Sequence, residues 1–192
     1  MAFSGGVDST LLLYAACEAL GKDNVFVLQG MSELLSRQEA VDAAALLVEL
    51  QIDEKQILKV ELLPLIWPEF VVNNQERCYF CKKRMYQSFQ RVIEALDASV
   101  LLDGSNVDDL KSHRPGFRAI HELGVKTPLL DAALNKEEIR SLAKRFHLSN
   151  YNKSSNSCLA TRLPEGTVIE KESLELVEKC EDFLAARSFT GC

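Results

Sequence analysis

Two kinds of hydrophobic periodicity alternate along the first two thirds of the chain. Short apolar runs rich in β-branched residues predict buried strands, and these runs lie at residues 25–28, 56–62 and 99–102. Apolar positions spaced three or four residues apart predict helices, within residues 9–20, 36–48, 85–96 and 135–146. Residues 1–3 have the composition of a strand end, and a last helix is predicted over 172–186. Because strands and helices alternate, we expect an α/β fold: a doubly wound, Rossmann-like parallel sheet with helices on both faces.

Polar residues at the ends of these segments mark the helix boundaries. Gly21 is typical of a helix C-terminus, because glycine adopts the left-handed conformation without strain. Ser36 and Glu39 have the spacing of a capping box, and Asn135 and Glu138 have the same spacing at a later helix. The boundaries therefore agree with the periodicity.

Two polar segments follow predicted strands, S-G-G-V-D-S-T at 4–10 and G-S-N-V-D-D at 104–109. Parallel sheets bind ligands beyond the carboxyl ends of their strands, so both segments face the expected ligand crevice. Gly5 and Gly6 allow a sharp turn and a close approach of a ligand to the backbone. The following helix directs N–H groups and the positive end of its dipole to the same place. With hydroxyl groups from Ser4, Ser9 and Thr10, the first segment is predicted to bind phosphate.

This phosphate loop contains no lysine, which separates it from the Gly-Lys-Ser/Thr loops of the kinase type. Asp8 is a negative charge beside a predicted anion site, and its expected use is to hold Mg²⁺ against the phosphates. Serine and aspartate also begin helices for stability alone. Seven such residues in this order after a strand favour the phosphate-binding interpretation.

Charge and composition limit the classes of partner. The 192-residue chain has a formal net charge of −6, which argues against an extended nucleic-acid-binding surface. No run of 18 apolar residues predicts a membrane span, and no basic segment followed by an apolar stretch predicts a signal peptide. We therefore expect a cytoplasmic protein whose six cysteines are reduced thiols. The sequence is compatible with a homo-oligomer.

Three of the cysteines lie in polar sequence. Cys78 and Cys81 form a C-x-x-C pair, which fits a metal, an iron–sulfur cluster or a redox couple. Cys158 lies in a polar loop near Lys153 and Arg162, and these cations are expected to favour its thiolate form. The loop position of Cys158 indicates a reactive thiol, and an idle surface thiol is the alternative.

Two further cysteines lie among apolar residues of predicted helices. Cys17 and Cys180 are therefore expected to be small buried thiols without a chemical role. The terminal Cys192 has no pattern to interpret. The three histidines have no ligand-like spacing, so no catalytic role is predicted for them.

The segment S-G-G-V-D-S at 4–9 resembles the PP-loop of the adenylating ATP pyrophosphatases. Members of that superfamily cut ATP between its α and β phosphates, leave AMP on the substrate and release pyrophosphate. The resemblance accounts for the missing lysine, because such a loop would hold the leaving pyrophosphate while the α-phosphorus is attacked.

Six segments together resemble the LarE family within this superfamily. They are A-F-S-G-G-V-D-S-T at 2–10, S-E-L at 32–34, E-R-C-Y-F-C-K-K at 76–83, L-D-G-S-N-V-D-D at 102–109, R-P-G at 114–116 and S-C-L-A-T-R-L-P-E-G-T at 157–167. The resemblance implies an ATP-dependent sulfur transferase of nickel-pincer nucleotide biosynthesis. Its substrate would be a small carboxylated nucleotide, pyridinium-3,5-biscarboxylate mononucleotide, and its cofactors ATP and Mg²⁺.

The resemblance also implies two versions of the sulfur source. In some family members a single cysteine, matching Cys158, gives up its own sulfur and becomes dehydroalanine. In others, three cysteines matching Cys78, Cys81 and Cys158 hold a [4Fe-4S] cluster that carries the sulfide to be delivered. Because this chain has all three cysteines, we favour the cluster version.

Further residues are predicted around the nucleotide. Ser32 matches a position at which the family contacts the base. Gly104 ends a predicted strand beside the crevice, and Arg114 and Arg118 are candidates to meet phosphate or carboxylate groups. The two acids at 108–109 are candidates to bind Mg²⁺ or orient a ribose. The alternatives are surface placement for the arginines and an acidic helix start at 108–109.

The resemblance divides the chain into a PP-loop ATP pyrophosphatase domain at 1–150 and the start of the sulfur-transfer loop and C-terminal region at 151–192. The family continues into a small domain with basic residues for the substrate phosphate, so we expect weak or absent full turnover, with ATP or AMP binding retained. The alternatives are another PP-loop ATP pyrophosphatase, either an amidating synthetase or a tRNA thiolase, and a catalytically impaired nucleotide-binding fragment. The acidic charge argues against tRNA, and Cys158 argues against amidation.

Overall fold

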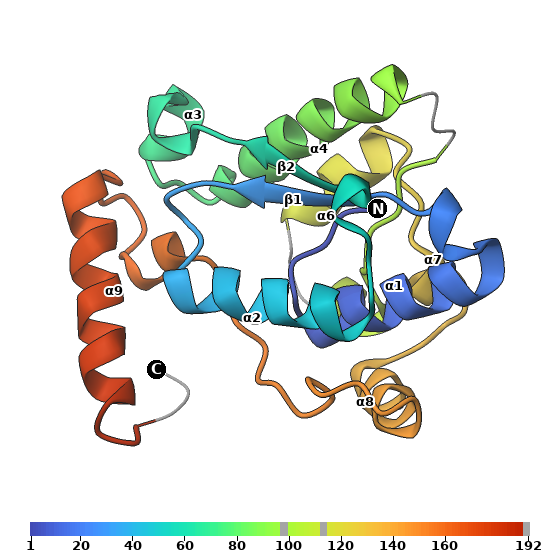
Figure 1. Cartoon of the computed structure of the whole chain (residues 1–192). Helices are drawn as coiled ribbons and strands as arrows, with labels where there is room; N and C mark the ends of the chain where they lie inside the picture. Colours follow the sequence, from blue (N-terminus) through green and yellow to red (C-terminus); the bar gives the residue numbers. More distant parts are fainter. Residues whose placement is uncertain (97–99, 112–114, 190–192) are drawn as a thin grey trace.

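The computed structural model describes residues 1–96, 100–111 and 115–189. A parallel sheet lies at its centre (Figure 1). Strands β1 (Val27–Met31) and β2 (Ile57–Glu61) pair in register, residue by residue, along their whole length. The predicted strands at 25–28 and 56–62 are these two, with β1 shifted toward the C-terminus because the 3-10 turn η1 (Lys22–Asn24) precedes it.

Extended segments at 1–3, 101–103 and 125–126 widen this pair of strands. A parallel bridge joins Ala2 to Leu28 of β1, and the N–H of Ala2 donates to the carbonyl of Leu102 at 2.9 Å. A second parallel bridge joins Leu102 to Lys126. The order across the sheet is therefore β2, β1, 1–3, 101–103 and 125–126. The chain starts in the middle and moves outward first in one direction and then in the other, which is the doubly wound arrangement that the sequence predicts.

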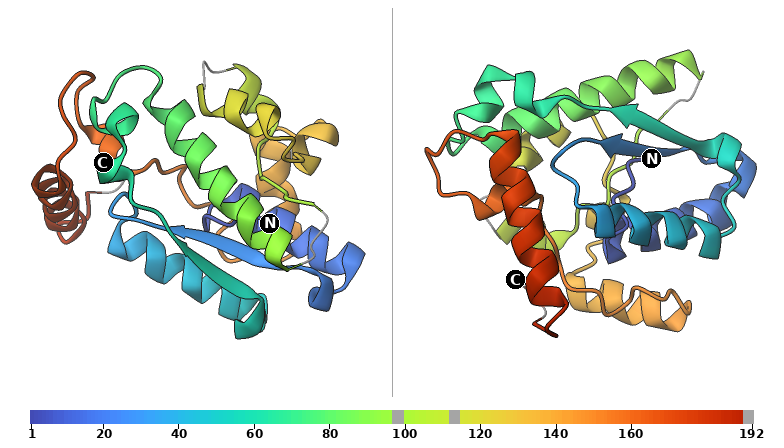
Figure 2. Two further views of the ribbon diagram at one scale, coloured as in Figure 1. Left: turned by 90° about the horizontal axis from the view of Figure 1, so that it is seen from above. Right: turned by 60° about the vertical axis from the view of Figure 1, so that its left-hand side comes forward.

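Helices cover both faces of the sheet, as the alternation of periods predicts. One face carries α1 (Val7–Leu20), α2 (Arg37–Glu49), α7 (Pro128–Asp131) and α8 (Lys136–Arg145), and the other carries α4 (Arg77–Ala95) and α6 (Pro115–Glu122). Successive residues of a strand point to opposite faces, so Val27 belongs to the first core cluster and Leu28 to the second. Figure 2 shows α4 lying across the strands.

A third core cluster ties the last part of the chain to one edge of the sheet. The remaining elements are α3 (Pro68–Val71), α5 (Val107–Lys111), α9 (Lys171–Ala185), η2 (Glu54–Gln56), η3 (Pro64–Ile66) and η4 (Leu159–Arg162). Leu159 of η4 and Leu174 of α9 pack with Leu34, which follows β1, and with Phe70 of α3. This packing holds α9 at the edge of the molecule, beside the start of α2 (Figures 1 and 2).

The helix boundaries follow the predicted capping residues. Gly21 ends α1 with φ 81°, and the hydroxyl of Ser36 accepts a hydrogen bond from the N–H of Glu39 at the start of α2. Asn135 and Glu138 form a complete capping box at α8. The sequence therefore predicts these boundaries for the right physical reason.

Some elements differ from the prediction. Helix α4 begins at Arg77, so it contains Cys78 and Cys81, which the apolar stripe starting at Met85 does not cover. The extended segment at 101–103 corresponds to the predicted strand at 99–102, but Ser99 lies outside the described residues. The sequence does not predict α6, α7 or the segment at 125–126. None of the described helices has the length and apolar character of a membrane span.

Candidate active site

One cavity lies beyond the carboxyl ends of the strands and has a volume of about 550 Å³. Small-molecule sites have volumes of about 300–1,000 Å³, so this cavity has the size of a ligand site. Its walls come from the loop after residue 3, the end of β1, the loop after 101–103 and the segment 153–158. The predicted site residues that line it are Ser4, Gly6, Asp8, Ser32, Cys81 and Cys158.

The phosphate loop has a conformation that needs glycine at position 5. Gly5 has φ 75°, and a Cβ built on it would lie 2.8 Å from the Cβ of Ala43 in α2. The hydroxyls of Ser9 and Thr10 donate to the carbonyl of Gly6 at 3.0 and 2.9 Å. Because these two hydroxyls point into the loop, they stabilise its shape rather than line the cavity.

A buried asparagine supports the loop from a distant part of the chain. The side-chain amide of Asn150 donates to the carbonyl of Gly5 at 3.2 Å and to the hydroxyl of Thr10 at 2.9 Å. Gly104 packs behind the loop, where an added Cβ would lie 3.1 Å from the backbone nitrogen of Ser9. No side chain caps the first turn of α1, which begins on the cavity wall. This arrangement suits an anion at a helix N-terminus.

Asp8 lies between two residues from distant parts of the chain. Its carboxylate accepts a hydrogen bond from Asn106 at 3.2 Å and pairs with the ammonium group of Lys136, the first residue of α8, at 2.5 Å. The backbone N–H of Lys136 donates to Asp108 at 2.8 Å, and Asp108 and Asp109 also line the cavity. Mg²⁺ in phosphate sites is usually held by one or two carboxylates together with the phosphates of the ligand, so these acids fit a magnesium ion in their chemistry only together with a bound nucleotide.

Two of the three thiols in polar sequence, Cys81 and Cys158, also line the cavity. Burial, together with the nearby Cys158 and Cys78, raises the pKa of Cys81 to about 12. Burial also raises the pKa of Cys158, and Arg77 acts in the opposite direction. Cys78 is exposed and lies outside the cavity lining. Cys81 and Cys158 therefore meet at the cavity wall, although they come from α4 and from the loop before η4.

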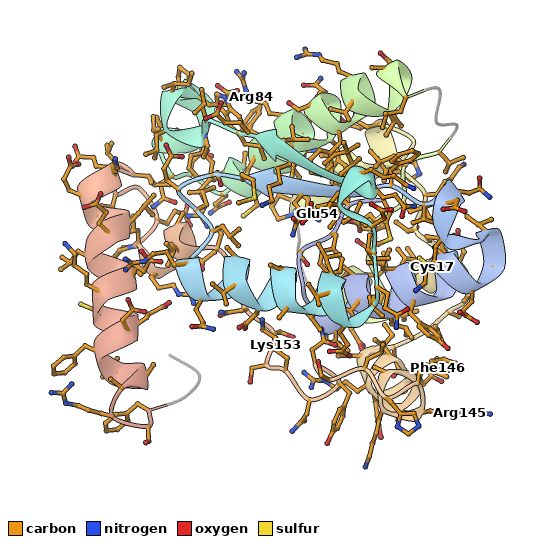
Figure 3. The ribbon with its side chains drawn as sticks, viewed as in Figure 1. Cys17, Glu54, Arg84, Arg145, Phe146 and Lys153 are labelled. Carbon is orange, nitrogen blue, oxygen red and sulfur yellow. The ribbon has the colours of Figure 1, made fainter. Side chains whose placement is uncertain are left out.

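Arg77 is a cation beside these thiols. Its guanidinium donates to the carbonyl of Ala160 at 3.0 Å and lies 3.8 Å from the sulfur of Cys78. The two cations expected beside Cys158 each pair with a carboxylate. Lys153 pairs with Asp42 of α2 at 2.7 Å, in the loop below that helix in Figure 3, and Arg162 pairs with a carboxylate of α9.

Thiolates are the ligands of iron–sulfur clusters, so the three thiols fit a cluster in the chemistry of their donor atoms. Within residues 1–96, 100–111 and 115–189, no group of three His, Cys, Asp or Glu side chains is arranged to hold one metal ion. Each thiolate of a [4Fe-4S] cluster binds a different iron, so its ligands are more widely spaced than those of one ion.

Two other expectations have different outcomes. Arg114 lies outside the described residues. Arg118 pairs with Glu76 and stacks 3.8 Å from the ring centroid of Tyr79, and it does not line the cavity. The expectation that Cys180 is buried is wrong, because it lies on the exposed face of α9, while Cys17 is buried as expected.

Sequence reasoning missed several polar residues of the site. They are Asn106, Lys136, Asn150 and Arg77. One signal was available for Lys136, because a cation in the first turn of a helix is unfavourable beside the positive end of the helix dipole. Such a residue needs a nearby anion, and Asp8 supplies it in this structure.

Comparisons with known proteins agree with this geometry. Residues 1–70 match the family described as NAD synthase. The chain is 34% identical over 184 residues to an uncharacterized protein of Synechocystis sp., covering 96% of the chain and 67% of the relative. It is 31% identical over 190 residues to the pyridinium-3,5-bisthiocarboxylic acid mononucleotide synthase of Lactiplantibacillus plantarum, covering 98% of the chain and 67% of that enzyme. The chain thus spans about two thirds of the length of these relatives.

A solved structure has the same fold. An NH3-dependent NAD synthetase from Campylobacter jejuni, in complex with a nitrate ion, superposes with a TM-score of 0.54. The two chains are 23% identical, and the match covers 97% of this chain and 76% of the synthetase. The doubly wound sheet is therefore shared.

Proposed function

The chain belongs to the LarE family of ATP-dependent sulfur transferases, and we propose that it adenylates a carboxylate of pyridinium-3,5-biscarboxylate mononucleotide and then replaces the AMP with sulfur. The observation that carries this proposal is that one cavity is lined at one end by the PP-loop and at the other by Cys81 and Cys158. A carboxylate becomes reactive only after activation, and the activated group then meets sulfur in the same space.

In the first step, a carboxylate oxygen of the substrate attacks the α-phosphorus of ATP. A bond forms between that oxygen and the α-phosphorus, and the bond to the bridging oxygen of the β-phosphate breaks, so that pyrophosphate leaves. The turn at Gly5 and the uncapped start of α1 receive the pyrophosphate. Asp8, with Asp108, would hold Mg²⁺, which would neutralise charge on the phosphates. Lys136 supplies the positive charge that the loop itself lacks.

In the second step, sulfur displaces AMP from the acyl adenylate. In the sacrificial version, the sulfur of Cys158 attacks the acyl carbon and AMP departs with its phosphate oxygen. The thioester then loses the Cα proton of Cys158 and its Cβ–S bond breaks, which leaves a thiocarboxylate and a dehydroalanine. The cysteine must first lose its thiol proton, and Arg77 stabilises the thiolate that forms.

The cluster version uses the same residues in a different way. Cys78, Cys81 and Cys158 would hold a [4Fe-4S] cluster, which would supply a bound sulfide in place of the cysteine's own sulfur. Burial raises the pKa of both Cys81 and Cys158, and a positively charged metal centre would stabilise their thiolates. We favour this version because the chain has all three cysteines, of which Cys81 and Cys158 line the cavity and Cys78 precedes Cys81 by one turn of α4.

A single-turnover reaction with stoichiometric protein tests the proposal. The chain is incubated with ATP, Mg²⁺ and the biscarboxylate mononucleotide, and both pyrophosphate and thiocarboxylate are measured. Asp8→Asn is expected to lose both products, whereas Cys158→Ala is expected to keep pyrophosphate release and lose the thiocarboxylate. Thiocarboxylate formation by Cys158→Ala at the wild-type level would contradict the proposal.

The same reaction separates the two sulfur sources. Iron and sulfide are counted in protein prepared without oxygen, and the mass of the chain is measured after turnover. The cluster version predicts bound iron and sulfide that disappear in Cys78→Ser. The sacrificial version predicts that each turnover removes about one H₂S from the peptide containing Cys158.

Amidation is the alternative raised by the similarity to NAD synthetases. At 23% identity that similarity shows the fold alone. An enzyme that uses ammonia has no need of three thiols at the end of its cavity. We therefore expect no amide when ammonium is added to the single-turnover reaction.

A further inference from the structure

One side chain, that of Arg162, makes several hydrogen bonds to the segment that carries Cys158. The guanidinium Nη1 of Arg162 contacts the carbonyl of Ser157 at 2.6 Å, its hydroxyl at 2.9 Å, the hydroxyl of Thr161 at 3.0 Å and the carbonyl of Cys158 at 3.3 Å. The second terminal nitrogen, Nη2, contacts the side-chain oxygen of Asn156 at 3.1 Å. Both terminal nitrogens of Arg162 are therefore bound to the turn from 156 to 161.

The third nitrogen of Arg162 is bound to α9. Its Nε pairs with the carboxylate of Glu181 at 2.6 Å, and the two side chains are only 20% and 24% exposed. A guanidinium is planar, so a carboxylate on its Nε fixes the plane in which both terminal nitrogens lie. Glu181 thus sets the direction from which Arg162 holds the turn around Cys158.

Cys158 lies at the point where this support acts. It precedes η4 as its N-cap residue, and its carbonyl also accepts a hydrogen bond from the hydroxyl of Thr161 at 2.7 Å. Its side chain packs against the third core cluster and lines the cavity. Residues 153–158 belong to no regular helix or strand, so the position of the sulfur depends on contacts such as these and on the hydrogen bond from the N–H of Leu159 to the carbonyl of Leu34 at 3.1 Å.

We propose that Arg162 and Glu181 are positioning residues that hold the sulfur of Cys158 in the cavity, which makes α9 a support of the sulfur site. The inference rests on the proposed function, in which Cys158 supplies or holds the sulfur. It gives α9 a role in the sulfur site, in addition to the roles of the PP-loop and the three cysteines. It also explains why Arg162, unlike Arg77, contacts the backbone of Cys158 rather than acting on its thiol.

The opposing explanation is an ion pair that stabilises the whole fold without directing the turn. Alkylation of each cysteine separates the two explanations, because the chain contains its own reference thiols. Cys17 is buried in the core and reports global opening, whereas Cys180 is exposed and reports reagent activity. The reduced, metal-free full chain is treated with iodoacetamide at fixed pH, and the rate at each cysteine is followed by peptide mass spectrometry.

The variants Arg162→Lys and Glu181→Gln test the proposal, and Asp182→Asn is the matched control. Asp182 is the next residue of α9 and pairs at 3.2 Å with Arg37 of α2. The substitution Asp182→Asn therefore removes a neighbouring charge without removing a contact to the turn around Cys158. We expect Arg162→Lys to speed alkylation of Cys158 about tenfold, because hydrogen bonds to a charged group are lost. Glu181→Gln should have a smaller effect that disappears in the Arg162→Lys background. The alkylation rate of Cys17 should not change in any of these variants.

Two results would overturn the proposal. One is an unchanged rate at Cys158 in both variants, or an equal change in Asp182→Asn. The other is a rise at Cys17 in parallel with Cys158, which would assign the pair to global stability.

The single-turnover reaction gives an independent reading. Arg162→Lys should keep the wild-type rate of pyrophosphate release and form thiocarboxylate at least about tenfold more slowly, because only the sulfur is displaced. If Cys158→Ala forms thiocarboxylate like wild type, the proposed function fails, but the alkylation rates still decide whether Arg162 holds the turn. The two failures are therefore distinguishable.

Discussion

At the scale of residues, the PP-loop shows what a sequence can and cannot predict. The need for glycine at position 5 follows from the motif, and its φ of 75° confirms it. The directions in which the hydroxyls of Ser9 and Thr10 point could not be predicted from the motif, because a hydroxyl group donates equally well to a ligand or to its own loop. The role of Asn150 could not be predicted at all, because it depends on a contact across 145 residues of sequence.

The two loop glycines are predicted to differ in their tolerance of alanine. Gly5→Ala places a Cβ against Ala43 and forces a non-glycine residue to a positive φ, which costs about 1–3 kcal/mol. Gly6 has φ −75°, and its nearest contact to an added Cβ is 3.5 Å away, so Gly6→Ala is the matched control. Urea denaturation should show a large loss for Gly5→Ala and a loss within about 0.5 kcal/mol for Gly6→Ala. Equal losses would contradict the loop conformation.

Lys136 is predicted to attract the β- and γ-phosphates of ATP, which AMP lacks. Lys136→Gln removes the charge now paired with Asp8, so the affinity for ATP should fall about tenfold while the affinity for AMP stays unchanged. Calorimetric titration with both nucleotides in the presence of Mg²⁺ measures the difference. The assignment would be wrong if Lys136→Gln weakened AMP and ATP binding equally.

At the scale of elements, the helical periods placed most helices but misplaced the start of α4. Its first two turns are polar and contain Cys78 and Cys81, so no apolar stripe predicts them. The structure shows in addition how α4 packs on the sheet. Tyr86 is buried on its inner face, and its hydroxyl donates to Asp103, the residue before Gly104. Helix α4 thereby joins the thiols to the segment that ends beside the PP-loop.

Tyr86→Phe is predicted to destabilise the fold by about 1–3 kcal/mol at neutral pH, because it leaves a buried carboxylate with one donor fewer. Burial acts to raise the pKa of Asp103, but Lys82, Ser105 and Tyr86 together lower it below its ordinary value. A depressed pKa contributes stability above the unfolded-state value of about 3.9, and this contribution is lost as pH falls through the folded-state pKa. The difference between wild type and variant should therefore shrink in acid.

Urea denaturation at several pH values measures this difference. Tyr14→Phe is the control, because Tyr14 is partly exposed and its ring packs against Phe146 at 4.8 Å. That variant should stay within about 0.5 kcal/mol of wild type. A Tyr86→Phe cost that is the same at neutral and acid pH would show that the hydroxyl does not act through the ionised Asp103.

At the scale of the whole molecule, the alternation of strands and helices was sufficient to predict a doubly wound α/β fold. That fold brings the PP-loop, the end of β1 and the loop after 101–103 to one edge of the sheet. The approach of Cys158 to the same edge could not be predicted from periodicity. It depends on the third core cluster, in which Leu159 and Leu174 meet Leu34 and Phe70. The division at residue 150 stays a prediction.

The central claim is that a single cavity brings the α-phosphate of ATP to the sulfur site. A crystal structure of the chain with α,β-methylene-ATP and Mg²⁺ tests it most directly, because the analogue cannot be cleaved at the reacting bond. We predict the β-phosphate at the backbone of Gly5 and Gly6, the metal at Asp8 and the α-phosphorus facing the wall that carries Cys158. A nucleotide bound elsewhere, or an α-phosphate turned away from Cys158, would contradict the account.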